Sequence, residues 1–169
     1  MRYDPDIHHR RSIRLRGYDY SQGGAYFVTL CTQQREQMLG SIVDDAVRLS
    51  PVGEIVQQTW GALPSRFPAV ELDAFVIMPD HVHGVLVIEV GEQGAASSAP
   101  TRLSTLARVM RAWKSISAIK INRCLSRNNQ PVWQRNYYER IIRSAVELEH
   151  IRTYIEQNPQ RWTHKHPSP

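Results

Sequence analysis

The feature that most constrains the fold is a pair of apolar segments separated by a two-residue turn. Residues 70–78 read Val-Glu-Leu-Asp-Ala-Phe-Val-Ile-Met, and after Pro79 and Asp80 a second segment runs from His81 to about Val90. Both segments are rich in the β-branched and aromatic residues that favour strands. A link this short cannot hold a crossover connection, so the two strands are predicted to be antiparallel neighbours in one sheet.

The rest of the chain alternates between strand and helix patterns. Ser50-Pro51 is a typical helix start, and Ser144 with Glu147 forms a capping-box pattern. The predicted order is strand, helix, strand, strand, helix, strand, helix, which is the split βαβ arrangement of α+β ferredoxin-like folds: an antiparallel sheet with two helices on one face, here with an added C-terminal helix. The predicted ranges are 25–32, 50–63, 70–78, 81–90, 101–124, 131–143 and 144–158, with a short extra strand at 38–43.

A length of 169 residues predicts a single domain over residues 1–169. Residues 1–24 are polar and basic and are expected to form an arm. Residues 91–100 are rich in Gly, Ser and Ala, which is typical of a flexible surface loop. Residues 160–169 are expected to form a loose tail.

Nothing in the sequence indicates export or a membrane. There is no run of eighteen apolar residues and no apolar signal core near Met1. Cys31 and Cys124 lie far apart in the sequence and fit a reducing compartment. We therefore expect a cytoplasmic protein.

The charge balance favours a polyanionic partner. Lys and Arg number 21 against 16 acidic residues, and the sequence pI is about 9.5. Several arginines lie near aromatic residues, and arginine binds phosphates while aromatic rings stack on unpaired bases. An ordinary solvated surface would show the same pattern. The candidate DNA contacts are Arg14, Arg16, Arg135, Tyr137, Tyr138 and Arg140.

Two histidines follow the turn directly. Side chains alternate along a strand, so His81 and His83 point the same way, about 7 Å apart along the strand. Two such imidazoles can converge on one divalent cation. The alternative is one histidine hydrogen-bonded in the core and one at the surface.

Tyr154 and Asn158 fall four residues apart on the last predicted helix, which places them on one face. Asn158 can add an oxygen ligand to a cation held by the histidines, a mixed set that Mg²⁺ or Mn²⁺ accepts. Tyr154 is then a candidate nucleophile. Alternatively, Tyr154 packs half-buried and Asn158 caps the helix before Pro159.

These segments together resemble the HUH single-tyrosine transposases of bacteria, in particular the REP-associated tyrosine transposases. The resemblance covers roughly residues 10–162. It is carried by Gly24-Ala-Tyr-Phe-Val-Thr-Leu-Cys-Thr32, Met78-Pro-Asp-His-Val-His-Gly84, Trp133-Gln-Arg-Asn-Tyr-Tyr138 and Tyr154-Ile-Glu-Gln-Asn-Pro159.

The resemblance implies a ferredoxin-like core with the nucleophile Tyr154 on a helix after the sheet. His81, His83 and Asn158 would be ligands of Mg²⁺ or Mn²⁺. The substrate would be single-stranded DNA folded into an imperfect hairpin, cut to give a 5′-phosphotyrosine and a free 3′-OH, and rejoined by a later 3′-OH attack. No nucleotide cofactor is implied. The location would be the bacterial nucleoid, and the protein would act as a monomer or homodimer.

Three alternatives remain open at this stage. Tyr137 or Tyr138 competes with Tyr154 as the nucleophile, although a strand position favours base stacking or packing. The same fold can serve as a regulator that binds hairpin DNA without cutting it. A small metal hydrolase that uses two histidines is a third function, which leaves the basic, aromatic-rich strand and the Tyr-Asn helix unexplained.

Overall fold

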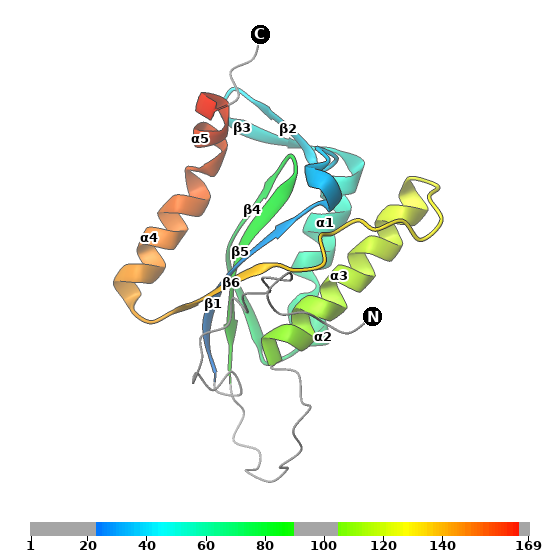
Figure 1. Cartoon of the computed structure of the whole chain (residues 1–169). Helices are drawn as coiled ribbons and strands as arrows, with labels where there is room; N and C mark the ends of the chain where they lie inside the picture. The colour runs from blue at the N-terminus through cyan, green and yellow to red at the C-terminus, as the bar shows by residue number, and fades with distance from the viewer. Residues whose placement is uncertain (1–22, 90–104, 166–169) are drawn as a thin grey trace, which may run out of the picture.

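A four-stranded antiparallel sheet in the order β4-β5-β1-β6 lies at the centre of the molecule (Figure 1). The structure is a computed structural model that describes residues 23–89 and 105–165. The strands are β1 Gly24–Cys31, β4 Val70–Met78, β5 His81–Ile88 and β6 Tyr138–Ile142. This order and the helices around it confirm the ferredoxin-like α+β fold.

The β4-β5 hairpin forms as predicted, with Met78 opposite His81 across the turn. Strand β5 is almost completely buried, because it lies between β4 and β1 and is covered on both faces. Gly84 in this strand leaves room for the Trp60 ring. A Cβ atom at Gly84 would stand 2.5 Å from Trp60 Cζ2, so any larger residue would displace the ring.

Helices α1 (Pro51–Gly61), α2 (Leu63–Arg66) and α3 (Thr105–Cys124) cover one face of the sheet (Figure 1). The Ser50 hydroxyl accepts a hydrogen bond from the Gly53 amide and starts α1, as predicted. The large core lies between these helices and the sheet. It includes Val28, Leu86, Val56, Trp60, Met110 and Trp113.

The opposite face is covered by α4 (Ala145–Glu156), which continues into α5 (Asn158–Lys165). Ser144 caps α4 by accepting a hydrogen bond from the Glu147 amide, as the capping-box pattern predicts. A smaller apolar cluster of Phe27, Val85, Ile142 and Ile155 holds α4 to the sheet. A β-bulge in β4 lies between Leu72 and Phe75, and Asp73 within it binds the Arg152 guanidinium of α4.

The segment between β1 and α1 contains more strand than predicted. A 3₁₀ turn, η1 (Gln33–Arg35), is followed by β2 (Gly40–Val43) and β3 (Ala46–Leu49), which pair as a hairpin. Asp44 and Asp45 form its turn with φ near +51° and +58°. Asp tolerates this left-handed conformation, but the Asp-Asp turn lacks the glycine that usually marks such a hairpin in a sequence.

The predicted strand at 131–143 is wrong over its first half. Strand β6 begins only at Tyr138, and before it Trp133 makes an isolated bridge with Thr32. The Trp133 indole donates to Ser117 Oγ at 2.9 Å. Lys114 Nζ donates to the carbonyl oxygens of Gln134 and Arg135. This segment is therefore held both by backbone hydrogen bonds to the end of β1 and by side chains of α3, without forming a regular strand.

The C-terminal helix also differs from the prediction of one helix followed by a loose tail. Helix α4 ends at Glu156, and α5 then runs from Asn158 to Lys165. Pro159 lies in the first turn of α5, where a missing N–H costs nothing. The expected arm, the 91–100 loop and the last residues lie outside the described residues apart from positions 23, 24 and 160–165. No helix in the described ranges combines the length and hydropathy needed to cross a membrane.

Candidate active site

His81 and His83 form the centre of a polar cluster on the sheet face that α4 covers. Both are buried, with 7% and 5% of their surfaces exposed. Their Nε2 atoms lie 3.1 Å apart, so the two imidazoles point at one position. The predicted convergence of the pair is therefore confirmed, and the alternative of one core and one surface histidine is wrong.

Each imidazole is held through its other nitrogen. His81 Nδ1 lies 2.5 Å from Asp80 Oδ1, and His83 Nδ1 lies 2.7 Å from Thr29 Oγ1. A carboxylate only accepts, so His81 donates from Nδ1 and carries its lone pair on Nε2. The Thr29 hydroxyl can donate or accept, so it supports either tautomer of His83. Asp80 in turn binds Arg35 Nε at 3.2 Å.

Both histidines are held in the neutral form that a metal ligand requires. Burial lowers the pKa of His83 from its ordinary value of 6.5 to about 3, with further contributions from nearby His81 and Arg35. Burial also lowers the pKa of His81, although the hydrogen bond to Asp80 opposes this shift. At neutral pH the Nε2 lone pair of His81 is therefore open to an ion, and that of His83 is open in the tautomer whose Nδ1 donates to Thr29 Oγ1.

The low pKa of His83 predicts acid sensitivity of the metal-free fold. The unfolded chain binds the proton first on acidification, so the stability is present above pH 6.5 and is lost as the pH falls toward 3. Each proton bound only by the unfolded state contributes a slope of about 1.4 kcal/mol per pH unit. We expect the urea midpoint measured in EDTA to fall with acidification more steeply for the wild type than for His83→Asn. Equal slopes of urea midpoint against pH for the two proteins between pH 6.5 and 4.5 would contradict this prediction.

The geometry of the pair fits a divalent cation. Octahedral Mg²⁺ with bonds of about 2.1 Å sets adjacent ligand atoms about 3.0 Å apart. The 3.1 Å between the two Nε2 atoms agrees with that edge. No group of three or more His, Cys, Asp or Glu side chains in the described ranges could hold a metal. A third protein ligand would therefore have to be a neutral oxygen, such as a carboxamide.

Tyr154 reaches the histidines from α4. Its hydroxyl lies 3.5 Å from His83 Nε2, at the outer limit of a hydrogen bond. The two rings stand edge to face with centroids 5.3 Å apart. Phe27 fixes both, because it stacks on His83 and meets Tyr154 edge-on. Tyr154 remains 36% exposed, so solvent and a substrate can reach the phenol.

Asn158 is buried at the start of α5, with 7% of its surface exposed. Trp162, one turn later on the same face, lies with its ring 5.9 Å from that of His81. The face that carries Asn158 thus turns toward the histidines. Tyr154 and Asn158 belong to two consecutive helices, so their shared face is not that of one continuous helix as predicted.

The other predicted DNA contacts divide between the two sheet faces. Tyr138 is 44% exposed and lies on the site face, in register with Thr29 and edge-on to Phe27. Arg140 shares that face and pairs with Glu147 at 2.6 Å. Tyr137 precedes the strand and packs against the large core on the other face. Arg135 is exposed beside α3, and Arg14 and Arg16 lie outside the described residues.

Four site residues were missed in the sequence: Thr29, Arg35, Asp80 and Arg161. Asp80 was interpreted as a turn residue, although its place directly before His81 was a usable signal for a carboxylate partner. Thr29 faces His83 only because β1 pairs with β5 in this register. Arg161 fell in the expected loose tail, where no helical face could be assigned.

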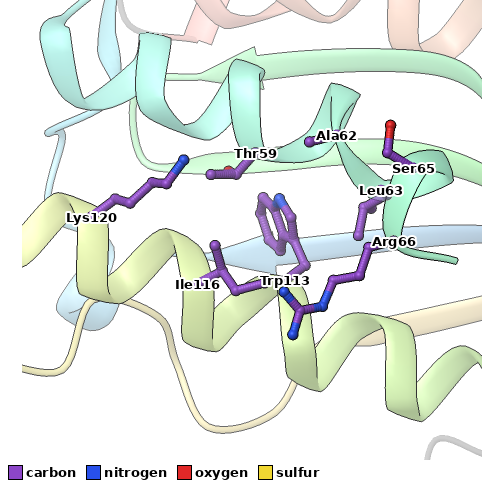
Figure 2. Close-up of a pocket in the computed structure, with 8 residues that line it drawn as sticks. All are labelled: Thr59, Ala62, Leu63, Ser65, Arg66, Trp113, Ile116 and Lys120. Carbon is purple, nitrogen blue, oxygen red and sulfur yellow. The ribbon is translucent and has the colours of Figure 1, made fainter.

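The face of α1, α2 and α3 carries a separate pocket of about 330 Å³ (Figure 2). Figure 2 shows Arg66 and Lys120 at its two ends, with Trp113 between them. Thr59 of α1 and Ala62, which lies between α1 and α2, line the same pocket. The sheet separates this pocket from His81, His83 and Tyr154.

Known proteins share this arrangement of elements. The profile of the family described as "Transposase IS200 like" matches residues 21–158. An uncharacterized protein of Haemophilus influenzae is 36% identical over 173 residues, which cover 95% of this chain and 94% of that protein.

Two solved structures share the fold at lower identity. A REP-associated tyrosine transposase bound to a REP hairpin has a TM-score of 0.60 and 21% identity, covering 88% of this chain and 73% of that one. A protein from Deinococcus radiodurans R1, described as a candidate transposase, has a TM-score of 0.50 and 22% identity, covering 85% and 96%. Since the family profile matches well over half of the chain, the protein belongs to the IS200-like transposase family.

Proposed function

We propose that this protein cleaves and rejoins single-stranded DNA at a folded hairpin, with Tyr154 as the nucleophile. A divalent cation, Mg²⁺ or Mn²⁺, would be held by His81, His83 and Asn158. The observation that carries the proposal is the 3.5 Å approach of the Tyr154 hydroxyl to His83 Nε2, between residues 71 positions apart in the sequence. A buried imidazole pair has no packing reason to meet a half-exposed phenol.

The reaction is a transfer of one phosphodiester. Tyr154 Oη forms a bond to phosphorus while the bond from phosphorus to the 3′-oxygen breaks, giving a 5′-phosphotyrosine and a 3′-OH. The phenol proton passes to solvent, and the departing 3′-oxygen takes up a proton from solvent. When bound, the cation supplies positive charge that stabilises the phosphate in the transition state. Attack by a 3′-OH on the phosphotyrosine reverses these bond changes and rejoins a strand.

The proposal of a hairpin substrate rests on structural similarity to another protein. A solved structure with the same fold is that of a REP-associated tyrosine transposase bound to a REP hairpin. Around the proposed site of this chain, Tyr138 offers an exposed ring on the same sheet face as His83, where an unpaired base could stack.

The test is a covalent-adduct assay with a pool of hairpin DNAs whose single-stranded flanks are randomised. With 3′-labelled DNA and Mg²⁺ or Mn²⁺, we expect a protein–DNA band that survives boiling in SDS, and no band in EDTA. The label must be at the 3′ end, because the protein would keep the fragment whose 5′ phosphate it holds. Binding of hairpin DNA without any adduct would establish the regulator that does not cut.

A further inference from the structure

Arg161 of α5 lies beside the proposed nucleophile. Its guanidinium carbon stands 5.4 Å from the centroid of the Tyr154 ring, in the range of a cation–π contact. Its Nη2 also donates to Gln157 Oε1 at 3.1 Å. Neither partner is an acid, so the contacts orient the guanidinium without neutralising its charge.

The two helices explain this position. Long side chains on a helix point back toward its N-terminus. Arg161 therefore extends from α5 over Gln157, at the junction of the helices, and reaches Tyr154 two turns earlier. The junction remains helical in its hydrogen bonding, since the Arg161 amide donates to the Gln157 carbonyl at 3.1 Å.

Other arginines of this region are already engaged by carboxylates. Arg35 pairs with Asp80, Arg140 pairs with Glu147, and Arg152 binds Asp73 and Glu149. Of these four arginines, Arg161 alone has no acidic partner in the described ranges. A cation placed on the nucleophile and left without a carboxylate can pair with a phosphate oxygen that arrives with the substrate.

We propose that Arg161 binds a non-bridging oxygen of the scissile phosphate and keeps that contact in the phosphotyrosine. This inference rests on the proposed function, because it needs Tyr154 to be the attacking group. Arg161 neither gives nor takes a proton: it matches the negative charge that grows on the phosphate oxygens during attack. The guanidinium moves from the face of the Tyr154 ring to the phosphate attached to its hydroxyl.

The test compares adduct formation at saturating hairpin DNA. We expect Arg161→Ala to form adduct roughly 100-fold more slowly than the wild type, the loss typical of one transition-state donor. Arg161→Lys should recover part of the rate. Arg48→Ala is the matched control, since it removes an equal charge from an exposed position on β3, which α5 contacts. Its rate should stay within about 3-fold of wild type, as usual for a surface change.

A methylphosphonate at the scissile position separates phosphate binding from a structural role. It replaces a charged non-bridging oxygen with a methyl group, so one of its two diastereomers should react equally with the wild type and Arg161→Ala. Free guanidinium should also restore the rate of Arg161→Ala on normal DNA. If the wild type forms adduct and Arg161→Ala matches it, or if the deficit persists on both diastereomers, the inference is wrong. If the wild type forms no adduct, the proposed function itself fails.

Discussion

Tyr154→Phe will abolish the covalent protein–DNA adduct and leave hairpin binding within a few-fold of wild type. Removing a catalytic nucleophile typically lowers the rate by a factor on the order of 10⁴ or more. The change deletes one oxygen from a ring that keeps its edge-on contact with Phe27, so α4 should stay in place. The adduct is measured by SDS gel with 3′-labelled DNA, and binding by fluorescence anisotropy.

Tyr138→Phe is the matched control for this experiment. Tyr138 meets the same Phe27 ring and lies on the same sheet face, but it stands on the far side of Thr29 from His83. We expect its adduct yield to resemble that of the wild type. If Tyr138→Phe lost the adduct and Tyr154→Phe kept it, the nucleophile would be Tyr138 on β6.

The second large effect is expected for His83→Ala. This variant removes one of two converging Nε2 atoms, and losing even an indirect partner of a metal ligand typically costs about 10–100-fold in metal affinity. We therefore expect more than a 100-fold weaker affinity for Mn²⁺ by calorimetry, and adduct formation slower by about 10³-fold, the upper range for losing one charge-stabilising group.

His150→Ala is its control, because His150 is an exposed histidine on α4 that takes part in no described contact with the site. It should bind Mn²⁺ as the wild type does. If His83→Ala bound Mn²⁺ with unchanged affinity, the imidazole pair would not be part of the metal site. Unchanged adduct formation despite lost metal binding would show that the reaction does not need the cation.

Local patterns were enough to predict the sheet and the helices that cover it. The β4-β5 hairpin could be predicted because a two-residue link permits only one pairing, and α1 and α4 because Ser50 and Ser144 cap them. The β2-β3 hairpin and the late start of β6 could not be predicted in this way. Asp44 and Asp45 adopt a turn that usually contains glycine, and the segment before Tyr138 is held at Trp133–Arg135 by α3 side chains.

The candidate site, too, could be predicted only in part from the sequence. The His81–His83 pair was readable because strand periodicity puts both residues on one face, whichever partners surround them. The residues around the pair could not be predicted. The Thr29 contact depends on strand register, and the Arg161 contact depends on a helix beyond Pro159. Tertiary contacts of this kind leave no period or motif in the sequence.

The distance along the chain between the imidazoles and the phenol sets the order in which the site can appear during synthesis. His81 and His83 pair with β1, which is made earlier, whereas Tyr154 follows 71 residues after His83. A ribosome-bound chain that stops before α4 has both imidazoles and lacks the phenol that would attack DNA. Under the proposed function, a nascent or prematurely terminated chain of this kind lacks the group that attacks DNA.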